Sequence, residues 1–401
     1  MSNLVGNWNY PTTVRFGAGR ISELPQHCRD LGMTRPLLVT DRGLANLPIV
    51  ADTVALLAAA GLPAAVFSDV HPNPTGADVN NGLTVLREGK HDGVIAFGGG
   101  SALDAAKAIA LMAGQTRPLW DFEDRADWWT RIDPNGMVPV VAVPTTSGTG
   151  SEVGRASVIL DEDVSVKKII FHPKMLPARV ICDPALTVGL PAFLTAATGI
   201  DALSHNLEAW CAPGFHPQAD GIAQQGIILI QESLLAAYMD GTDIDARSKM
   251  MAASLMGATA FQKGLGAMHS IAHVVGAQLH AHHGLLNAIV MPYVLVHNRS
   301  AIEPRIVVLA RSMGLEPTFE AFLAWVLELR AATHTPHTLD AVGVTEAHVA
   351  SFAAASVDDP STGSNPLPMD AAAFESLYRR CLTGGHLTAT VLGPRSIFQE
   401  F

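Results

Sequence analysis

The sequence predicts an α/β domain built around a mainly parallel sheet, followed by an all-helical domain. Over the first half of the chain, short runs of β-branched residues alternate with longer amphipathic segments, the pattern of a parallel sheet covered by helices on both faces. Beyond about Pro191, long segments rich in Ala, Leu and Ile follow one another with few strand signals between them. We place the boundary within 182–191, where a last short strand meets a Gly/Pro pair, and expect domains at 1–188 and 189–401.

The expected strands of the first domain are short apolar runs bounded by turn-forming residues. They cover 35–40, 64–67, 93–97 and 138–143. The segments between them have helical spacing, and the first of these helices has a proline in its first turn. The helices are expected at 48–60, 78–88 and 101–112. Alternation of this kind predicts a doubly wound sheet, in which ligands bind at the carboxyl ends of the strands.

The second domain is expected to be a group of packed helices. Their segments cover 194–210, 217–238, 246–261 and 267–280. Residues 358–369 (DDPSTGSNPLPM) are rich in Pro, Ser and Asp, which predicts a loop between helical stretches.

Composition and charge exclude several classes of protein. The 401 residues include 26 Lys and Arg against 37 Asp and Glu, a formal net charge of −11, without a basic cluster. Nucleic acids and anionic membrane surfaces are therefore poor partners. The four cysteines are scattered and form no CxxC pair, which favours free, packed thiols in a reducing compartment. No secretion signal and no bilayer-spanning apolar stretch is visible, so we expect a cytoplasmic protein.

A glycine-rich loop follows the strand expected at 93–97. Three glycines at 98–100 precede Ser101, which opens the next helix. A strand that runs into glycines and then into a helix start presents backbone N–H groups and the helix dipole to an anion, for which pyrophosphate is the obvious candidate. The loop does not match the GxGxxG fingerprint, because Leu103 replaces the third glycine, and it is not a Walker A loop. Taken alone, the loop is equally consistent with a tight structural turn.

A second loop, 144–152 (PTTSGTGSE), follows the strand expected at 138–143. Its glycines let the backbone approach a ligand, and its hydroxyls offer donors to phosphate or ribose oxygens. It lacks the GxSxG pattern of a serine nucleophile. Two such loops at the ends of neighbouring strands predict a nucleotide site. Asp41, directly after the first strand, is placed either to bind a ribose hydroxyl or to cap the next segment.

The second half carries histidines with helical spacing. Asp201 and His205 stand four residues apart in an expected helix, so both project from one face. His269 and His273 repeat this spacing, and five of the 16 histidines fall between positions 269 and 283. An Asp and several His on largely apolar helices are costly to bury unless a cation collects them. This donor set suits Fe²⁺ or Zn²⁺, and ligand type does not choose between the two.

Four motifs give the chain a resemblance to the iron-containing (group III) alcohol dehydrogenase family. They are GGGSALDAAK, PTTSGTGSEV, ATGIDALSHNLEAW and MHSIAHVVGAQLHAHHGLLNAIVMPYV, and the match runs in order over nearly the whole chain. The resemblance implies a nucleotide-binding α/β domain followed by an all-helical metal-binding domain, the fold shared with dehydroquinate synthase. The family's metal ligands fall on Asp201, His205, His269 and His283, and its histidine beside the nicotinamide falls on His273. His280 and His282 lie outside this ligand pattern and are expected behind the ligands or in the pocket wall.

The same resemblance implies a dinucleotide site in the first domain. It matches Asp41 to the acid that binds the adenosine ribose and Lys167 to a lysine beside the cofactor, with Lys168 as the neighbouring alternative. The other matched positions lie in the PNPT loop and in the two glycine-rich loops: Asn73, Gly99, Gly100, Ser101, Asp104, Thr145, Thr146 and Thr149. A carboxylate at Asp41 would repel the 2′-phosphate of NADP, so NAD is the expected cofactor. A homo-oligomer, at least a dimer, is implied as well.

These residues together predict a metal-dependent oxidoreductase that moves a hydride between NAD(H) and a small primary alcohol or aldehyde. A divalent cation lowers the pKa of a bound oxygen and polarises a carbonyl, and the resemblance favours Fe²⁺, with Zn²⁺ as the alternative. His273 is the expected relay for the alcohol proton. If the ammonium group of Lys263 faces the pocket, a short ω-hydroxy acid or its semialdehyde is favoured; a lysine facing solvent or an interface carries no such preference.

Two other interpretations stay open at this point. A dehydroquinate-synthase-like lyase or a zinc polyol dehydrogenase would share the fold, but those relatives typically lack the ligand that falls on His205. A non-enzymatic nucleotide- or metal-binding homologue would be expected to have degenerate motifs, whereas both cofactor loops and every ligand position are intact.

Overall fold

The computed structural model describes residues 6–8, 12–385 and 387 of the chain. The chain divides into two compact units. Unit 1 comprises residues 1–190 and 241–251, and unit 2 comprises residues 191–240 and 252–401. The segment 241–251 returns to unit 1 and includes the start of helix α7 (Ile244–Ala260). We keep 1–188 and 189–401 as the proposed division into functional domains.

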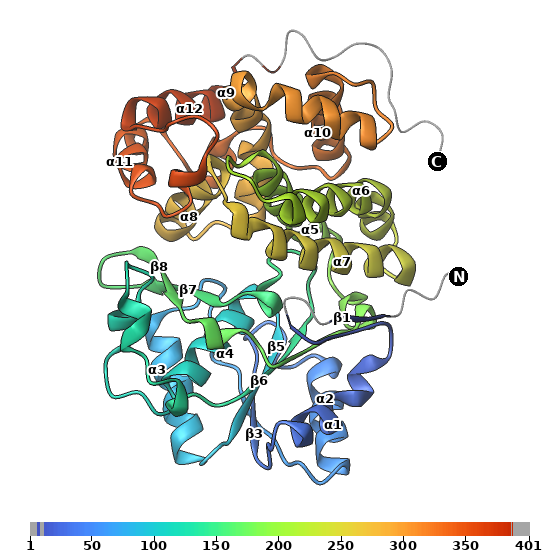
Figure 1. Cartoon of the computed structure of the whole chain (residues 1–401), viewed down its shortest axis with the longest axis vertical. Coiled ribbons are helices and arrows are strands. Elements are labelled where there is room, and N and C mark those ends of the chain that lie inside the picture. The colour runs from blue at the N-terminus through green and yellow to red at the C-terminus, as the bar shows by residue number, and fades with distance from the viewer. Residues whose placement is uncertain (1–5, 9–11, 386, 388–401) are drawn as a thin grey trace. The chain divides into compact units, whose positions relative to one another are not determined.

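In the described part of unit 1, seven strands form one sheet in the order β1-β2-β9-β6-β5-β3-β4 (Figure 1). The strands are β1 (Gly6–Trp8), β2 (Val14–Phe16), β3 (Pro36–Val39), β4 (Ala65–Phe67), β5 (Gly93–Gly98), β6 (Val140–Pro144) and β9 (Arg179–Cys182). Every neighbouring pair is parallel except β1 with β2. The central strands β3, β5 and β6 are buried along their whole length, as expected for a sheet with helices on both faces.

Helices cover the sheet on its two sides (Figure 1). They are α1 (Leu24–Asp30), α2 (Pro48–Ala59), α3 (Gly76–Glu88) and α4 (Gly100–Met112). Residues of α1 and α2 pack against β3, β5 and β6 in one apolar core. Local sequence explains where two helices begin: Pro48 opens α2, and Thr75 forms a capping box with Asp78 at the start of α3.

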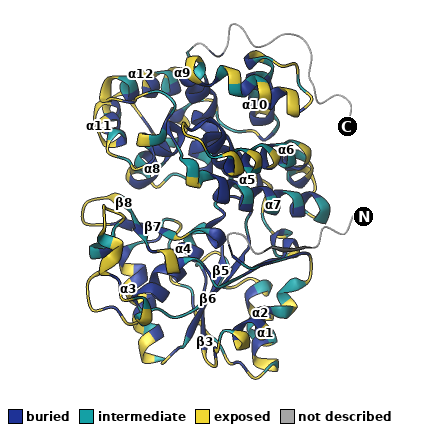
Figure 2. Cartoon of the chain, viewed as in Figure 1, coloured by how far each residue is buried: buried dark blue, intermediate teal, exposed yellow. Residues whose placement is uncertain are grey.

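The described part of unit 2 contains helices and connecting loops and no strand. Its helices are α5 (Ala192–Cys211), α6 (Pro217–Met239), the second half of α7, α8 (Ala267–Leu279), α9 (His283–Ser312), α10 (Phe319–Ala332), α11 (Glu346–Val357) and α12 (Ala371–Thr383). Helix α5 packs against α6 and α9 and is buried along most of its length (Figure 2). The loop predicted at 358–369 lies between α11 and α12.

The strands and helices predicted from the sequence are confirmed, with each limit within two residues of the observed one. The antiparallel hairpin of β7 (Ala156–Asp161) and β8 (Val166–Phe171) was not predicted, because two consecutive lysines in β8 interrupt the alternation of apolar and polar residues that indicates a strand. The four cysteines are free and buried, as expected. Burial raises the pKa of the Cys28 and Cys211 thiols to about 12. Within the described residues, no helix has both the length and the apolarity needed to cross a bilayer.

Candidate metal centre and nucleotide loops

Three buried side chains of unit 2 converge on one point. Asp201 and His205 lie one turn apart on α5, and His269 lies on α8. None is more than 3% exposed, and one ligand atom from each lies within 4.8 Å of the others. The imidazoles of His205 and His269 are stacked, with their ring centroids 4.6 Å apart. A carboxylate and imidazoles brought together in an apolar interior are a donor set that fits Fe²⁺ or Zn²⁺.

His283, the first residue of α9, adjoins this group. Its Nε2 lies 3.6 Å from Asp201 Oδ1, and its ring centroid lies 5.3 Å from that of His269. The two neighbouring histidines have roles at the turn between α8 and α9. His280 ends α8 in the left-handed conformation, and the His282 side chain accepts a hydrogen bond from the Leu285 N–H at the start of α9.

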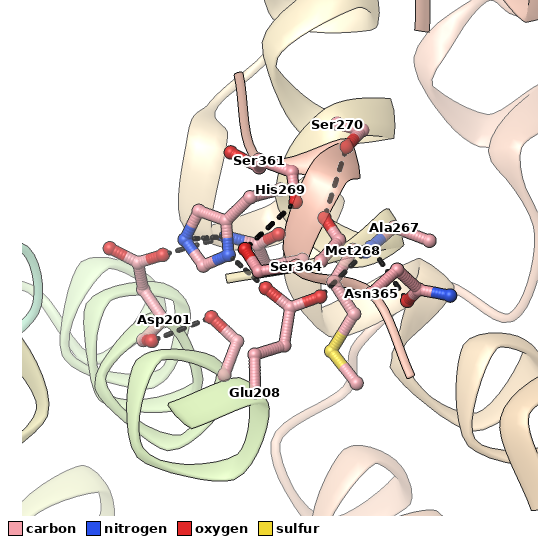
Figure 3. A network of polar contacts seen from close by, with 12 residues as sticks. Asp201, Glu208, Ala267, Met268, His269, Ser270, Ser361, Ser364 and Asn365 are labelled. Carbon is pink, nitrogen blue, oxygen red and sulfur yellow. Dashed lines mark hydrogen bonds and ion pairs between the residues drawn. The ribbon is translucent and has the colours of Figure 1, made fainter. Parts of the chain in front are cut away.

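Glu208, which the sequence analysis did not single out, orients His269 (Figure 3). Its Oε2 lies 2.6 Å from His269 Nδ1, and its Oε1 accepts a hydrogen bond of 2.8 Å from the Met268 N–H. With Nδ1–H donated to this carboxylate, Nε2 carries the lone pair that a metal needs. Burial by itself lowers the pKa of His269, but Glu208 together with Asp201 and Asp359 outweighs burial, and the pKa lies above its ordinary value. The signal for Glu208 was its spacing, since it follows His205 by three residues on the same helix.

Replacing Glu208 by Gln is expected to weaken metal binding about ten- to a hundredfold, as for other outer partners of metal-binding histidines. Glutamine removes the negative charge that would make His269 a good metal ligand and cannot accept both hydrogen bonds in the same way. Zn²⁺ affinity measured by competition with a chromophoric chelator tests this. Glu303→Gln is the matched control, because Glu303 is on the exposed side of α9 and pairs with Arg299. Equal affinities in the two variants would contradict the prediction.

His273 lies one turn beyond His269 on α8 and is held by a carboxylate. Its Nδ1 is 2.9 Å from Asp359 Oδ2, and its ring stacks on that of His283 with centroids 5.3 Å apart. Burial alone would raise the pKa of Asp359, but the His273 imidazole and the hydrogen bonds around it outweigh burial and lower that pKa. The sequence indicated His273 but not Asp359, because the two residues are 86 positions apart.

The loop that carries Asp359 is fastened to the start of α8 (Figure 3). The hydroxyls of Ser270 and Thr362 are 2.7 Å apart, and Asn365 accepts a hydrogen bond of 3.2 Å from the Ala267 N–H. Asn365 also exchanges hydrogen bonds with Asn298 on α9. These contacts hold Asp359 at a defined position beside His273.

Lys263 is neither exposed to solvent nor available to a substrate. Its side chain is 2% exposed, and its Nζ lies 2.6 Å from Asp220 Oδ1 and 3.4 Å from the Trp210 carbonyl oxygen. Arg305 binds the same two residues. Both alternatives drawn from the sequence for this lysine are therefore wrong: its charge is paired inside unit 2.

Replacing Lys263 by Met is expected to lower the free energy of unfolding by about 2 kcal/mol, the value of a hydrogen bond to a charged group. The preference between acidic and neutral substrates should stay the same, because the ammonium group already binds Asp220. The test compares kcat/KM for a short ω-hydroxy acid with that for a neutral primary alcohol of the same length, in the wild type and the variant. A selective loss of activity on the acid would contradict this interpretation.

The two glycine-rich loops of unit 1 leave the same edge of the sheet. Strands β5 and β6 are parallel neighbours, and the Thr145 N–H donates to the Gly98 carbonyl oxygen at 2.9 Å. The loops touch so closely that a Cβ at Gly100 would lie 2.4 Å from the Thr149 hydroxyl oxygen. Gly98 has φ +148° and brings its backbone close to Asp41, at the end of the adjacent strand β3. The sequence prediction that these loops are neighbours is confirmed.

Two of the predicted cofactor residues, Asp104 and Ser101, brace the loops. Both oxygens of Asp104 are engaged, Oδ1 by the Ser151 hydroxyl and Oδ2 by the Val158 N–H at 3.0 Å. The Ser101 hydroxyl donates to the Pro72 carbonyl oxygen and so ties the first loop to the segment that carries Asn73.

Asp41 and the two candidate lysines, Lys167 and Lys168, differ in the contacts that their side chains make. Asp41 Oδ1 accepts hydrogen bonds from the Gly43 and Leu44 N–H groups, so it does cap the next segment. Burial raises the pKa of Asp41. Lys168 pairs with Asp161 at 2.5 Å, whereas Lys167 projects to the other face of the hairpin by strand alternation.

The second loop also contains a buried acid. Glu152 is 2% exposed, and its Oε1 has no hydrogen-bond partner among the described residues. Lys107 is buried nearby and donates to the carbonyl oxygens of Ser151, at 3.0 Å, and Ala156. Burial raises the pKa of Glu152 to about 7, against a partial lowering by Lys107.

Comparison with known proteins agrees with the fold and identifies the family. Residues 11–184 match the family model "iron-containing alcohol dehydrogenase", and residues 195–382 match the C-terminal model of the same family. The 4-hydroxybutyrate dehydrogenase of Cupriavidus necator is 40% identical over 93% of this chain and 99% of its own length. The chain therefore belongs to the iron-containing alcohol dehydrogenase family and is an oxidoreductase of that family.

Solved structures of relatives have the same architecture. A 1,3-propanediol oxidoreductase superposes with a TM-score of 0.88 and 34% identity over 95% of this chain and 99% of that chain. The sulfoacetaldehyde reductase of Bifidobacterium kashiwanohense, solved in complex with NAD⁺, has a TM-score of 0.84 and 26% identity over 96% of this chain and 99% of its own.

Proposed function

We propose that this protein transfers a hydride between NAD(H) and a small primary alcohol or its aldehyde. The observation that carries the proposal is the convergence of Asp201, His205 and His269 inside unit 2. With His283 as fourth ligand, these residues would hold Fe²⁺, or alternatively Zn²⁺. When bound there, the cation would act as a Lewis acid on the oxygen of the alcohol or of the carbonyl.

The chain's own residues supply orientation and proton transfer. Glu208 keeps Nε2 of His269 directed at the metal position. Asp359 holds His273 by Nδ1, which leaves Nε2 as the atom that can take up the alcohol proton and pass it to solvent. His283 lies against the same ring.

The loops of unit 1 are the proposed site for NAD. Backbone N–H groups at Gly99 and Gly100, at the start of α4, suit a pyrophosphate. The remaining proposed cofactor contacts come from Asn73, Ser101, Thr145, Thr146, Thr149 and Lys167. Asp104 braces the two loops. Asp41 favours NAD over NADP by charge. When bound, NAD supplies the hydride acceptor, and the NAD⁺ complex of the sulfoacetaldehyde reductase supports the choice.

A short ω-hydroxy acid and its semialdehyde are the second candidate pair. The similarity to a 4-hydroxybutyrate dehydrogenase favours it. Lys263 does not support it, because its ammonium group is bound by Asp220. A carboxylate on the substrate would therefore need a different cationic partner. We also propose that the protein is cytoplasmic and forms a homo-oligomer, at least a dimer. Sedimentation of the purified chain tests the oligomeric state.

Replacing His273 by Ala is expected to lower turnover about a hundredfold or more while metal content stays full, since general acid–base groups contribute about 10²–10⁴ in rate. Asp359→Asn should show a smaller loss of the same kind. Metal content is measured by elemental analysis beside the steady-state rates. Loss of metal from His273→Ala would overturn the role assigned to this histidine.

The function itself is tested by absorbance at the reduced-nicotinamide band. Metal-free protein is reloaded anaerobically with Fe²⁺ or Zn²⁺ and given NAD⁺ with neutral alcohols or ω-hydroxy acids, and NADH with the matching aldehydes. Turnover that requires metal establishes the reaction, and the better substrate series decides between the two candidates. Tight binding of metal and NADH without turnover on either series would refute both.

A further inference from the structure

One buried amide lies among the candidate ligands. Asn287 is one turn beyond His283 on α9 and is fully buried. Its Nδ2 lies 2.8 Å from Asp201 Oδ1, 3.4 Å from His269 Nε2 and 3.3 Å from His283 Nε2. A single NH₂ group therefore faces the atoms that would bind the metal in three of the four proposed ligands.

Only the nitrogen of this amide has hydrogen-bond partners among the described residues. Its Oδ1 has no hydrogen-bond partner among the described residues. An amide oxygen buried without a partner is destabilising, so packing alone does not account for an asparagine at this position. The contacts of the amide nitrogen explain why an asparagine is found here. The lone pairs of one carboxylate and two imidazoles repel one another, and the N–H groups are the positive partner that they share.

We propose that Asn287 is a positioning residue of the metal centre, which holds Asp201, His269 and His283 together before the cation arrives. This inference rests on the proposed function, because it takes the converging residues to be metal ligands. A site gathered in advance loses less conformational entropy on binding, so affinity rises. If the amide only filled the place of the cation, its removal would make metal binding tighter.

The test replaces Asn287 by Leu, which has the same branching and the same number of side-chain heavy atoms but no hydrogen-bond donor. Zn²⁺ affinity is measured by competition with a chromophoric chelator, and the visible absorption of the Co²⁺-loaded protein reports the ligand geometry. Zn²⁺ affinity is expected to fall about ten- to a hundredfold, with a changed Co²⁺ spectrum. Asn287→Ser, which keeps a short donor, should give an intermediate loss and serves if the leucine variant does not fold.

Asn206→Ala is the matched control. Asn206 is also a fully buried amide with an unpartnered Oδ1, but its Nδ2 donates to the carbonyl oxygens of Ala202 and Ala253. The inference holds if affinity falls for the Asn287 variants and not for this control. Unchanged or tighter binding at Asn287, or an equal loss in the control, overturns it. If the wild type binds neither Zn²⁺ nor Co²⁺, the proposed function fails rather than this inference alone.

Discussion

Replacing His205 by Ala is expected to reduce alcohol oxidation about a thousandfold and to remove the metal from the protein. Lewis-acid stabilisation by a bound cation is worth several kcal/mol, and about 1.4 kcal/mol corresponds to a factor of ten in rate. His205 is buried against His269 and Phe261, with ring centroids 4.6 Å and 5.2 Å away, so its removal leaves a gap beside the other proposed ligands. The checks are kcat/KM with NAD⁺ and the metal content of the purified variant.

His280→Asn is the control for this experiment. His280 belongs to the same histidine-rich segment, and Asn tolerates the left-handed backbone at φ 54°. The control is expected to keep its metal and its activity. Chelated wild-type protein should recover activity when metal is returned, and His205→Ala should not. A variant that lost its metal but kept full turnover would show that the reaction proceeds without the centre.

Glu152→Gln is expected to change how stability depends on pH. The pKa of Glu152 is about 7 in the folded chain because of burial, against an ordinary value of 4.5. Between these two values the folded state holds a proton that the unfolded state has lost, so wild-type stability falls as the pH rises from 4.5 to 7. The full cost is present above pH 7 and amounts to about 3.5 kcal/mol, at about 1.4 kcal/mol per pH unit. Glutamine stays neutral and removes it.

The variant should therefore be more stable than the wild type at pH 8 and show no such gain at pH 4.5. Urea unfolding of the two proteins at both pH values measures the difference. Glu88→Gln, on the exposed side of α3, is the control for loss of one carboxylate. A stability difference that does not vary with pH would mean that the pKa of Glu152 is the same in the folded and the unfolded chain.

The parts of the site that the sequence predicted are local. Asp201 with His205 and His269 with His273 are each separated by one helical turn, and the observed helices α5 and α8 place each pair on one face. The two glycine-rich loops follow strands that could be recognised from their apolar runs. Spacing and periodicity are enough for such features because the backbone geometry over a few residues is the same in any fold.

Long-range packing supplies the rest. Glu208 meets a histidine 61 positions away, and Asn287 and Asp359 each meet their partner across 86 positions. Lys263 illustrates the same limit, since its spacing said nothing about Asp220, which lies 43 positions earlier. The spacing of residues in the sequence does not predict such pairs, because they depend on which helix faces are buried against one another.

The sequence by itself determined the order of the elements, the helical division after the sheet, the two adjacent loops and the residue types able to bind a cation. Only the tertiary structure decided which polar groups are paired inside unit 2: Glu208 with His269, Asp359 with His273, Asn287 with Asp201, and Lys263 with Asp220. The physical reason is burial. A polar group removed from water must find its partner wherever the packed chain brings one, and distance along the sequence does not constrain that choice.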